Sequence, residues 1–519
     1  MESASVPAGG TAGSAAGGAK EGDKGLKTGA LGYLSNLVIG VASTAPGYSL
    51  AATLGFVTLV AGMGFHAPAV MIVAFIPMLL IAAAYNYMNK ADPDCGTSFT
   101  WVTRAMGPHL GWLTGWAIVA ADVVVMATLA YIAGVYTFLL FGLDGAAGSI
   151  LDVSIAAVVW IAVMTWICWR GIELSARIQY FLLAMEIFTL ALFSIVALIK
   201  VYTGNPAGAV DPSLNWLNPF NIPGGTTALV DGVLLGVFIY WGWDSGVCVN
   251  EESEDSSNGP GRAAVMSTVL LVLIYVVVAV AAQAYHGPGF LSNHADDVLS
   301  SLGSDVFPSP LDKLLIIAVL TSASASTQTT ILPTARTTLS MARFESIPSV
   351  FGRIHPRYLT PDVSTIVMGV VSLIWTLFII NISQNVLADS ITGLGFLIAF
   401  YYGLTGYACV VYYRREIFKS LRNFVFVGLA PLLGGLMLTG IFIKAFSDYN
   451  TTSTDINYTG GIAGVGGPVA IGVGLIVLGA VLMVFANIVY PKFFKRKPEV
   501  VDPGILEGTV TGEASVMAD

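Results

Sequence analysis

Two long apolar segments of this chain are interrupted near their middles. Residues 43–47 read Ser-Thr-Ala-Pro-Gly, and residues 240–244 read Tyr-Trp-Gly-Trp-Asp. A helix that crosses lipid must satisfy every backbone N–H and C=O group internally, because hydrocarbon offers no hydrogen-bond partner. Proline and glycine release some of these groups, which is tolerated where the groups line a cavity or hold a ligand. One interrupted helix early in the chain and another five spans later predict an inverted-repeat secondary transporter.

Composition places most of the chain in a membrane. Of the 519 residues, 55% are hydrophobic and 11% are charged, whereas soluble proteins carry about 25% charged residues. Apolar runs of about 20 residues recur along the chain, which predicts an all-α polytopic membrane protein with about twelve transmembrane helices. The expected spans are 31–61, 67–89, 107–141, 151–169, 173–202, 225–250, 262–285, 311–343, 362–381, 387–413, 421–447 and 466–490.

The spans also predict a division into domains. Helices 1 and 6 are the interrupted ones, so each opens a set of five helices, and we expect the two sets to be inverted repeats followed by two further helices. The Gly-, Ala- and Ser-rich start of the chain is typical of a disordered tail. The expected parts are the tail 1–30, the transmembrane domain 31–490 (first repeat 31–202, second repeat 225–413, last two helices 421–490) and the tail 491–519.

The basic residues are distributed unevenly between the two sides of the predicted membrane domain. Of the 23 Lys and Arg residues, only Lys200, Lys313 and Lys444 fall on the side opposite the N-terminus. The positive-inside rule therefore predicts that both termini are cytoplasmic and that the number of spans is even. We expect a multi-pass protein of the cell membrane.

The two interruptions offer complementary charges to a ligand. Pro46 and Gly47 begin a second half-helix, whose first N–H groups suit a carboxylate. The half-helix that ends near Tyr240 presents carbonyl groups that suit an ammonium group. Together these two sets of groups match the charges of an α-amino acid. The alternative for the first interruption is a plain proline kink without a ligand. The alternative for the aromatic residues of the second interruption is that they face lipid or the protein core. The predicted substrate-binding residues are Ser43, Thr44, Ala45, Pro46, Gly47, Phe238, Ile239, Tyr240 and Trp241.

Two carboxylates fall at membrane depth, where ionisable groups are costly. Glu186 lies near the middle of the span 173–202, and Asp122 lies in the span 107–141. Each is either a structural carboxyl bonded to a neighbouring helix or a functional group. Glu186 is a candidate proton carrier, because burial favours the protonated carboxyl, and it is also a candidate partner for a basic substrate.

Other polar residues have weaker signals. Ser322, Ser326 and Thr329 share one helical face, which fits a sodium site as well as ordinary packing of small residues between helices. We expect Asp244 to cap the half-helix that follows it. One of the aromatic residues Phe396, Tyr401 and Tyr402 is a candidate gate. The sequence predicts no cofactor, no metal and no nucleic-acid partner, and it leaves the oligomeric state open.

The chain resembles amino acid–polyamine–organocation permeases over about residues 31–420. The resemblance rests on several motifs that occur in the family's order: 96–101 with Gly107-Pro108 and Gly111-Trp112; 238–244 with Glu251-Glu252 and 260–262; and 333–336 with 341–343, 355–357 and Pro361.

This resemblance implies uptake or exchange of amino acids or amines by alternating access, coupled to protons or sodium. It also implies that residues 43–47 and 238–241 form the substrate site. Several relatives carry a lysine where this chain has Glu186, so the coupling ion stays open between H+ and Na+. We expect a proton-coupled amino acid transporter, with a polyamine or amine importer or an exchanger as the alternative. A membrane-embedded enzyme is disfavoured because no G-x-S-x-G or H-E-x-x-H motif occurs.

Overall fold

The computed structural model describes residues 24–498, apart from 205, 296, 383–385 and 451–464. Most of the expected tails, 1–23 and 499–519, thus lies outside the described residues. Over the described ranges the regular elements are helices, and one isolated bridge joins Leu31 to Ser253.

The helices follow the predicted order of spans. The first part of the chain forms α1 (Tyr33–Ser43), α2 (Pro46–Leu59), α3 (Ala67–Ala91), α4 (Ser98–Met106), α5 (Pro108–Leu140), α6 (Asp144–Ala147), α7 (Ile150–Arg170) and α8 (Ile172–Gly204). The middle part forms η1 (Leu214–Leu217), η2 (Pro219–Asn221), α9 (Gly225–Ile239), α10 (Ser245–Cys248), η3 (Asn250–Glu252), α11 (Gly259–Asn293), α12 (Val298–Val306), α13 (Lys313–Arg343), η4 (Ser349–Gly352), α14 (Asp362–Ile382) and α15 (Val386–Tyr412). The last part forms η5 (Ile417–Lys419), α16 (Leu421–Asn423), the π-helical turn η6 (Phe424–Leu429), α17 (Ala430–Tyr449), α18 (Gly467–Val489) and α19 (Pro491–Phe494).

The protein is an all-α polytopic membrane protein. Among the described residues, 11 helical segments are long and apolar enough to cross a membrane, with α1 and α2 counted together. The remaining predicted span contains the shorter apolar helix α9, which is followed by the second interruption and by α10. Both interruptions therefore occur where the sequence predicts them. The inverted relation between the two sets of five spans stays a prediction.

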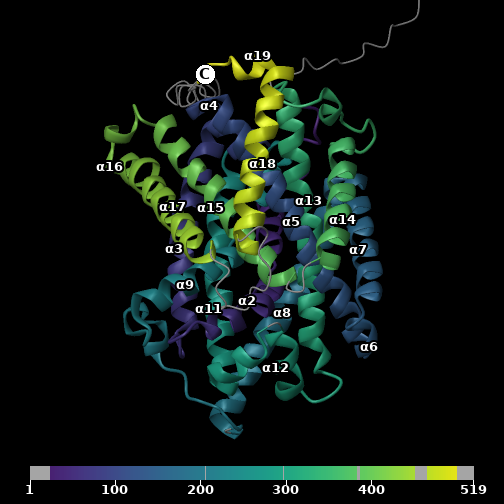
Figure 1. Cartoon of the computed structure of the whole chain (residues 1–519), viewed down its shortest axis with the longest axis vertical. Coiled ribbons are helices and arrows are strands. Elements are labelled where there is room, and N and C mark those ends of the chain that lie inside the picture. The colour runs from purple at the N-terminus through teal and green to yellow at the C-terminus, as the bar shows by residue number, and fades with distance from the viewer. Residues whose placement is uncertain (1–23, 205, 296, 383–385, 451–464, 499–519) are drawn as a thin grey trace, which may run out of the picture.

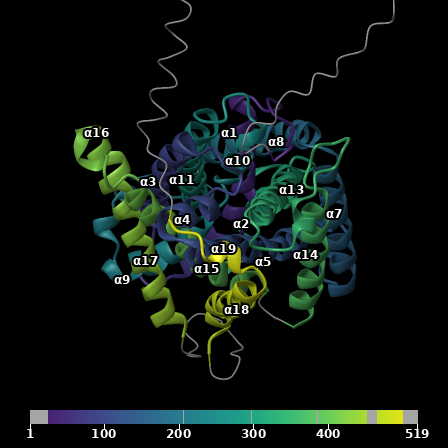
Figure 2. The same cartoon turned by 90° about the horizontal axis from the view of Figure 1, so that it is seen from above.

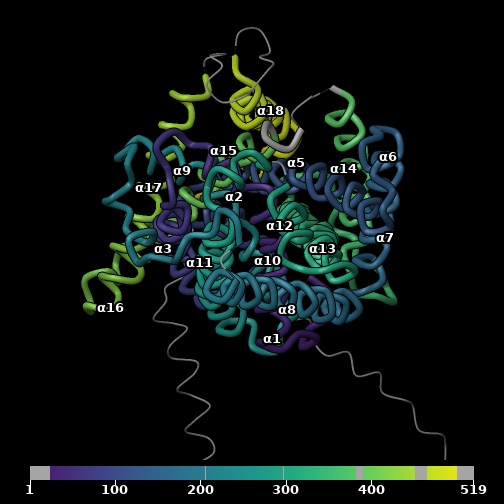
Figure 3. The backbone as a smooth tube through the Cα atoms, turned by 90° about the horizontal axis from the view of Figure 1, so that it is seen from below, coloured from purple at the N-terminus to yellow at the C-terminus, as the bar shows by residue number. Residues whose placement is uncertain are grey.

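The long helices run side by side along the long axis of the molecule, with α4 and α19 near one end and α12 near the other (Figure 1). Seen along that axis, α2 and α13 lie toward the middle, whereas α7, α14, α17 and α18 lie at the periphery (Figure 2). The tube view from the opposite end shows α8 and α1 along one side, with α10 and α13 inside them (Figure 3). Peripheral helices carry exposed large apolar side chains, such as Phe188 on α8 and Phe485 on α18, as a lipid-facing surface requires.

The described residues of the expected N-terminal tail pack against the helices. The side chains of Lys24 and Leu26 are buried. The N–H groups of Ala30 and Leu31 both donate to the carbonyl of Glu252. This segment covers the end of the molecule where α4 and α19 lie, and we call that end the terminal face.

Candidate functional site

The first interruption separates α1 from α2 by two residues, Thr44 and Ala45. Ala45 adopts a left-handed conformation, with φ 49° and ψ 65°. Such a conformation costs a non-glycine residue about 1–3 kcal/mol and is concentrated at functional sites. Pro46 then occupies the first position of α2, where its fixed φ suits a helix and its missing N–H costs nothing.

The second interruption touches the first one directly. Gly242 has φ 117°, and a Cβ atom there would lie 2.8 Å from the carbonyl carbon of Ser43. The Oγ atoms of Ser43 and Ser245 are 2.8 Å apart and share a hydrogen bond. Glycine is needed at position 242 both for its backbone angle and for this close approach.

Side chains from α8 and α13 satisfy the backbone groups that the first interruption releases. The N–H of Gly47 donates to Glu186 Oε1 over 2.7 Å. The N–H of Tyr48 donates to Ser322 Oγ over 3.0 Å, and Ser326 Oγ donates to the carbonyl of Ser43 over 2.8 Å. In this structure the start of α2 is thus occupied by the protein's own acceptors rather than left open.

Several groups at the end of α9 also have partners. The carbonyl of Ile239 accepts a hydrogen bond from the hydroxyl of Tyr275, and the hydroxyl of Tyr240 donates to the carbonyl of Met71 over 2.8 Å. Both tether the end of α9 to neighbouring helices.

The expected cap role of Asp244 is wrong. Its side chain makes no capping hydrogen bond to α10. Its carboxylate instead accepts from the hydroxyls of Tyr402 at 2.9 Å, Tyr401 at 3.1 Å and Tyr85 at 3.4 Å. Tyr401 in turn accepts a hydrogen bond from the indole N–H of Trp241. Asp244 is therefore connected through the hydroxyl of Tyr401 to Trp241, and it binds directly to Tyr401 and Tyr402, two of the candidate gate residues.

A cavity of about 20 Å³ lies between the two interruptions, which is room for about one water molecule. Its charged lining residues, among those described, are Asp122 and Asp244. Asp122 accepts a hydrogen bond from Thr334. The residues that line the cavity are Ser43, Thr44, Ala45, Tyr48, Ser49, Ile118, Asp122, Val125, Leu129, Phe238, Trp241, Gly242, Asp244, Ser245, Ser326, Thr330, Pro333 and Tyr401.

The structure brings some predicted residues to this cavity and holds others behind it. The predicted residues that line it are Ser43, Thr44, Ala45, Phe238, Trp241, Asp122 and Ser326, and those outside the lining are Pro46, Gly47, Ile239, Tyr240, Glu186, Ser322 and Thr329. Glu186 and Ser322 reach the site through the backbone of α2. The hydroxyl of Thr329 donates to carbonyls of its own helix at 3.2 and 3.3 Å, so it does not join the other two hydroxyls.

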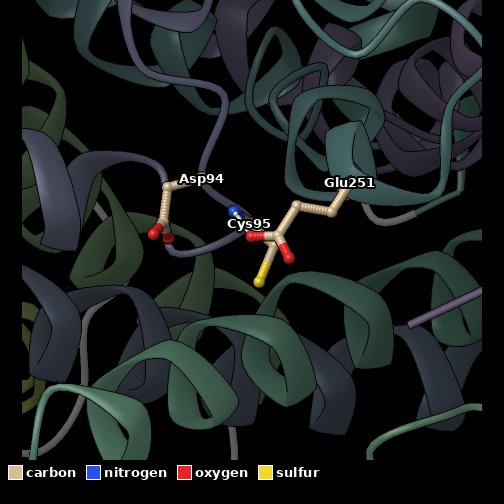
Figure 4. Close-up of side chains that lie close together, drawn as sticks. All are labelled: Asp94, Cys95 and Glu251. Carbon is tan, nitrogen blue, oxygen red and sulfur yellow. Dashed lines mark hydrogen bonds between the residues drawn. The ribbon is translucent and has the colours of Figure 1, made fainter. Parts of the chain in front are cut away.

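A second set of charged groups closes the terminal face. The ammonium of Lys24 lies 2.8 Å from Asp94 Oδ2 and also contacts Glu251. Figure 4 shows Asp94 and Glu251 on either side of Cys95, whose backbone N–H donates to Glu251 over 2.8 Å. The ligand atoms of these three residues lie close enough together for a metal ion, but Lys24 already supplies the positive charge between the carboxylates.

The charges of this cluster set its protonation. Burial lowers the pKa of Lys24, but the acidic groups around the ammonium, Asp94 first and Glu251 with it, together outweigh burial, so the pKa of Lys24 lies above its usual value. Burial alone would raise the pKa of Asp94, but the Lys24 ammonium and the hydrogen bonds from the Gly96 N–H and the Thr100 hydroxyl together outweigh burial and lower the pKa to about 2. Burial raises the pKa of Asp92 to about 6, against the opposing charge of Arg104. Lys24 and Asp94 are therefore an ion pair at neutral pH.

A further ion pair lies behind this cluster. The guanidinium of Arg336 on α13 donates two hydrogen bonds, of 2.7 and 2.9 Å, to Glu252. Both side chains are almost completely buried. Because Glu252 also accepts backbone hydrogen bonds from Ala30 and Leu31, the pair ties the N-terminal segment to α13.

Paired interrupted helices around a small central cavity, within a bundle of membrane-spanning helices, define a class of membrane transporters. Comparison of the sequence with known protein families places the chain within that class. A family model described as amino acid permease matches residues 31–468, so the chain belongs to the amino acid permease family. Members of this family are transporters rather than enzymes, and this protein is a membrane transporter.

Three relatives show how diverse the substrates in this family are. The chain is 24% identical to the methylthioribose transporter of Bacillus subtilis, over 58% of this chain and 65% of that protein. It is 21% identical to the low-affinity putrescine importer PlaP of Escherichia coli, over 73% and 81%. It is 23% identical to the branched-chain amino acid permease BcaP of Lactococcus lactis, over 58% and 64%. The substrate of this chain has to be argued from its own site.

Proposed function

We propose that this protein is a secondary active transporter that moves a small ammonium-bearing molecule, an amino acid or an amine, across the cell membrane by alternating access. The observation that carries the proposal is the cavity between the two interrupted helices. Its lining contains the carboxylates of Asp122 and Asp244 and, among the described residues, no Lys, Arg or His. Negative charge in a low-dielectric site attracts a cation strongly.

In this proposal the substrate lies between residues 43–47 and residues 238–241. Ser43, Thr44 and Ala45 line one side of the cavity, and Phe238 and Trp241 line the other. The present cavity holds about one water molecule, so a larger ligand requires the half-helices to move apart. Such movement of one set of helices against another is what alternating access requires.

Glu186 is the proposed site of proton coupling. One of its oxygens accepts from the N–H of Gly47, whereas Oε2 is buried and has no hydrogen-bond partner among the described residues. A proton on this carboxyl removes its charge and weakens its hold on α2. Proton uptake and release at Glu186 would thereby be linked to the movement of α2.

Sodium is the alternative coupling ion, and the hydroxyls of Ser322 and Ser326 are the candidate ligands. In this structure each of them already bonds to the backbone beside the first interruption. This arrangement favours the proton over sodium.

The terminal face is proposed to be cytoplasmic. The ends of the described chain lie there, as does most of the basic charge that the positive-inside rule assigns to the cytoplasm. The N-terminal segment with Lys24 would then close the cytoplasmic side in the conformation described above.

The test is uptake by proteoliposomes that contain the purified protein, with radiolabelled amino acids and amines offered under an imposed pH gradient. We expect concentrative uptake of an ammonium-bearing compound by the parent, and loss of uptake in Asp122→Asn. Glu186→Gln, which mimics the protonated carboxyl, should impair gradient-driven accumulation more than exchange between two substrate pools. If Glu186→Gln accumulates substrate under the pH gradient as well as the parent does, Glu186 is not the site of proton coupling. Full uptake by both Asp122→Asn and Asp244→Asn would contradict the proposed cation site.

A further inference from the structure

The position that suits a substrate carboxylate is filled by the protein itself. Pro46 has no N–H group, the N–H of Gly47 donates to Glu186 over 2.7 Å, and the N–H of Tyr48 donates to Ser322 over 3.0 Å. These are the first residues of α2, where backbone N–H groups lack acceptors within the helix. The carboxylate of Glu186 therefore lies where the carboxylate of an amino acid would be held.

We infer that Glu186 takes the place of a substrate carboxylate, and that this transporter carries an organic amine that lacks one. The inference rests on the transporter function proposed above and specifies the substrate of the same site. Two observations support it independently of the start of α2. The cavity lining already contains Asp122 and Asp244, and the second oxygen of Glu186 is buried without a hydrogen-bond partner among the described residues.

The donors around these carboxylates leave the negative charge of the site uncancelled. Asp244 is held by tyrosine hydroxyls and Asp122 by the hydroxyl of Thr334. A hydroxyl donor stabilises a carboxylate but carries no net charge. A bound amine supplies the missing positive charge, whereas a zwitterion adds a carboxylate to a site that already contains several.

An amino acid would also have to displace Glu186 from Gly47. The displaced side chain is fully buried, so its carboxylate would lose its backbone donor without gaining water. An unpaired buried charge is strongly unfavourable. A decarboxylated amine binds without this rearrangement, so the presence of Glu186 discriminates between the two kinds of substrate.

The experiment compares pairs of compounds that differ by one carboxylate: lysine with cadaverine, ornithine with putrescine, arginine with agmatine, and tyrosine with tyramine. Binding of each to the purified, full-length protein is measured by ligand-induced thermal shift and by competition for uptake. In at least one pair we expect the amine to bind about tenfold or more tightly than its parent amino acid, because like charges placed together weaken binding. Equal or tighter binding of the amino acid in every responding pair would overturn the inference and leave the transporter function intact. Absence of binding by every member would overturn both.

Two variants at position 186 separate this role from a merely structural one. Glu186→Ala uncovers the N–H of Gly47 and removes the charge, so binding of the parent amino acid should improve relative to its amine. Glu186→Gln keeps an acceptor oxygen of the same size over that N–H and serves as the control, with a smaller gain for the amino acid. An unchanged ratio of amino acid to amine affinity in both folded variants would show that Glu186 does not select the substrate.

Discussion

Removal of the Lys24 ammonium should shift the balance between closed and open states of the terminal face toward the open state. This ammonium bridges Asp94 and Glu251, and the side chains of the three residues are 7%, 11% and 15% exposed. In Lys24→Gln the two carboxylates lose their shared counter-charge while the face stays closed. When the face opens, water reaches both carboxylates. The loss of the counter-charge therefore raises the free energy of the closed state more than that of the open state.

The size of the effect follows from the burial of the cluster. Removing one partner of a buried ion pair costs about 3–5 kcal/mol, and each 1.4 kcal/mol changes an equilibrium constant tenfold. We therefore expect the open state of Lys24→Gln to gain roughly 100- to 5,000-fold in population relative to the closed state.

The chain contains its own reporter for this opening. Cys95 lies between the two carboxylates and is fully buried, with its thiol directed at the carbonyl of Arg336. Its reaction with a maleimide requires the terminal face to open. Labelling of Cys95, located by mass spectrometry of the peptides, should be roughly 100-fold faster or more in Lys24→Gln than in the parent.

Lys27 provides a matched control three residues along the chain. It pairs with Glu173, but the two side chains are 42% and 54% exposed, and exposed pairs contribute about 0–1 kcal/mol. Lys27→Gln should label at the rate of the parent. Equal rates for Lys24→Gln and Lys27→Gln would refute the conclusion that the Lys24 cluster holds this face closed.

Two further predictions concern the interruption and the loop after α3. Gly242→Ala should lower the free energy of unfolding in detergent by about 1–3 kcal/mol, because its Cβ would lie 2.8 Å from the Ser43 backbone. Gly474→Ala is the control, because Gly474 has open space around it. Equal melting curves for the two variants would contradict the close approach of the two interruptions. Burial raises the pKa of Asp92 to about 6, against the opposing charge of Arg104, so ionisation of Asp92 lowers the free energy of unfolding as the pH rises from about 4 to 6. In Asp92→Asn the free energy of unfolding should depend less on pH over that range. An unchanged pH dependence would exclude Asp92 as its cause.

The interruptions could be predicted because their causes are local. Proline at position 46 and glycine at positions 47 and 242 alter the backbone wherever the chain folds. The partners of the released groups are different, because Glu186 lies 139 positions from Gly47. A single sequence shows that such groups need acceptors but not which distant side chain supplies them.

The role of Asp244 and the packing of Lys24 were missed for the same reason. A carboxylate just before a short helix is typical of a cap, and only the arrangement of α15 shows that tyrosine hydroxyls bind it instead. Lys24 lies in a stretch whose composition is typical of a disordered tail, and its partner Glu251 is 227 positions away. Tail composition predicts weak burial of apolar surface, but it does not reveal an ion pair.

The two groups of buried carboxylates are compensated in different ways, which separates their roles. At the terminal face Asp94, Glu251 and Glu252 face the fixed cations of Lys24 and Arg336. Around the central cavity Asp122 and Asp244 face hydroxyls, and Glu186 faces a backbone N–H. A fixed cation cancels the field of a carboxylate, whereas a neutral donor stabilises the anion and leaves its charge available. An incoming cation is therefore attracted to the centre and not to the terminal face, where the same kind of residue serves instead to hold the helices closed.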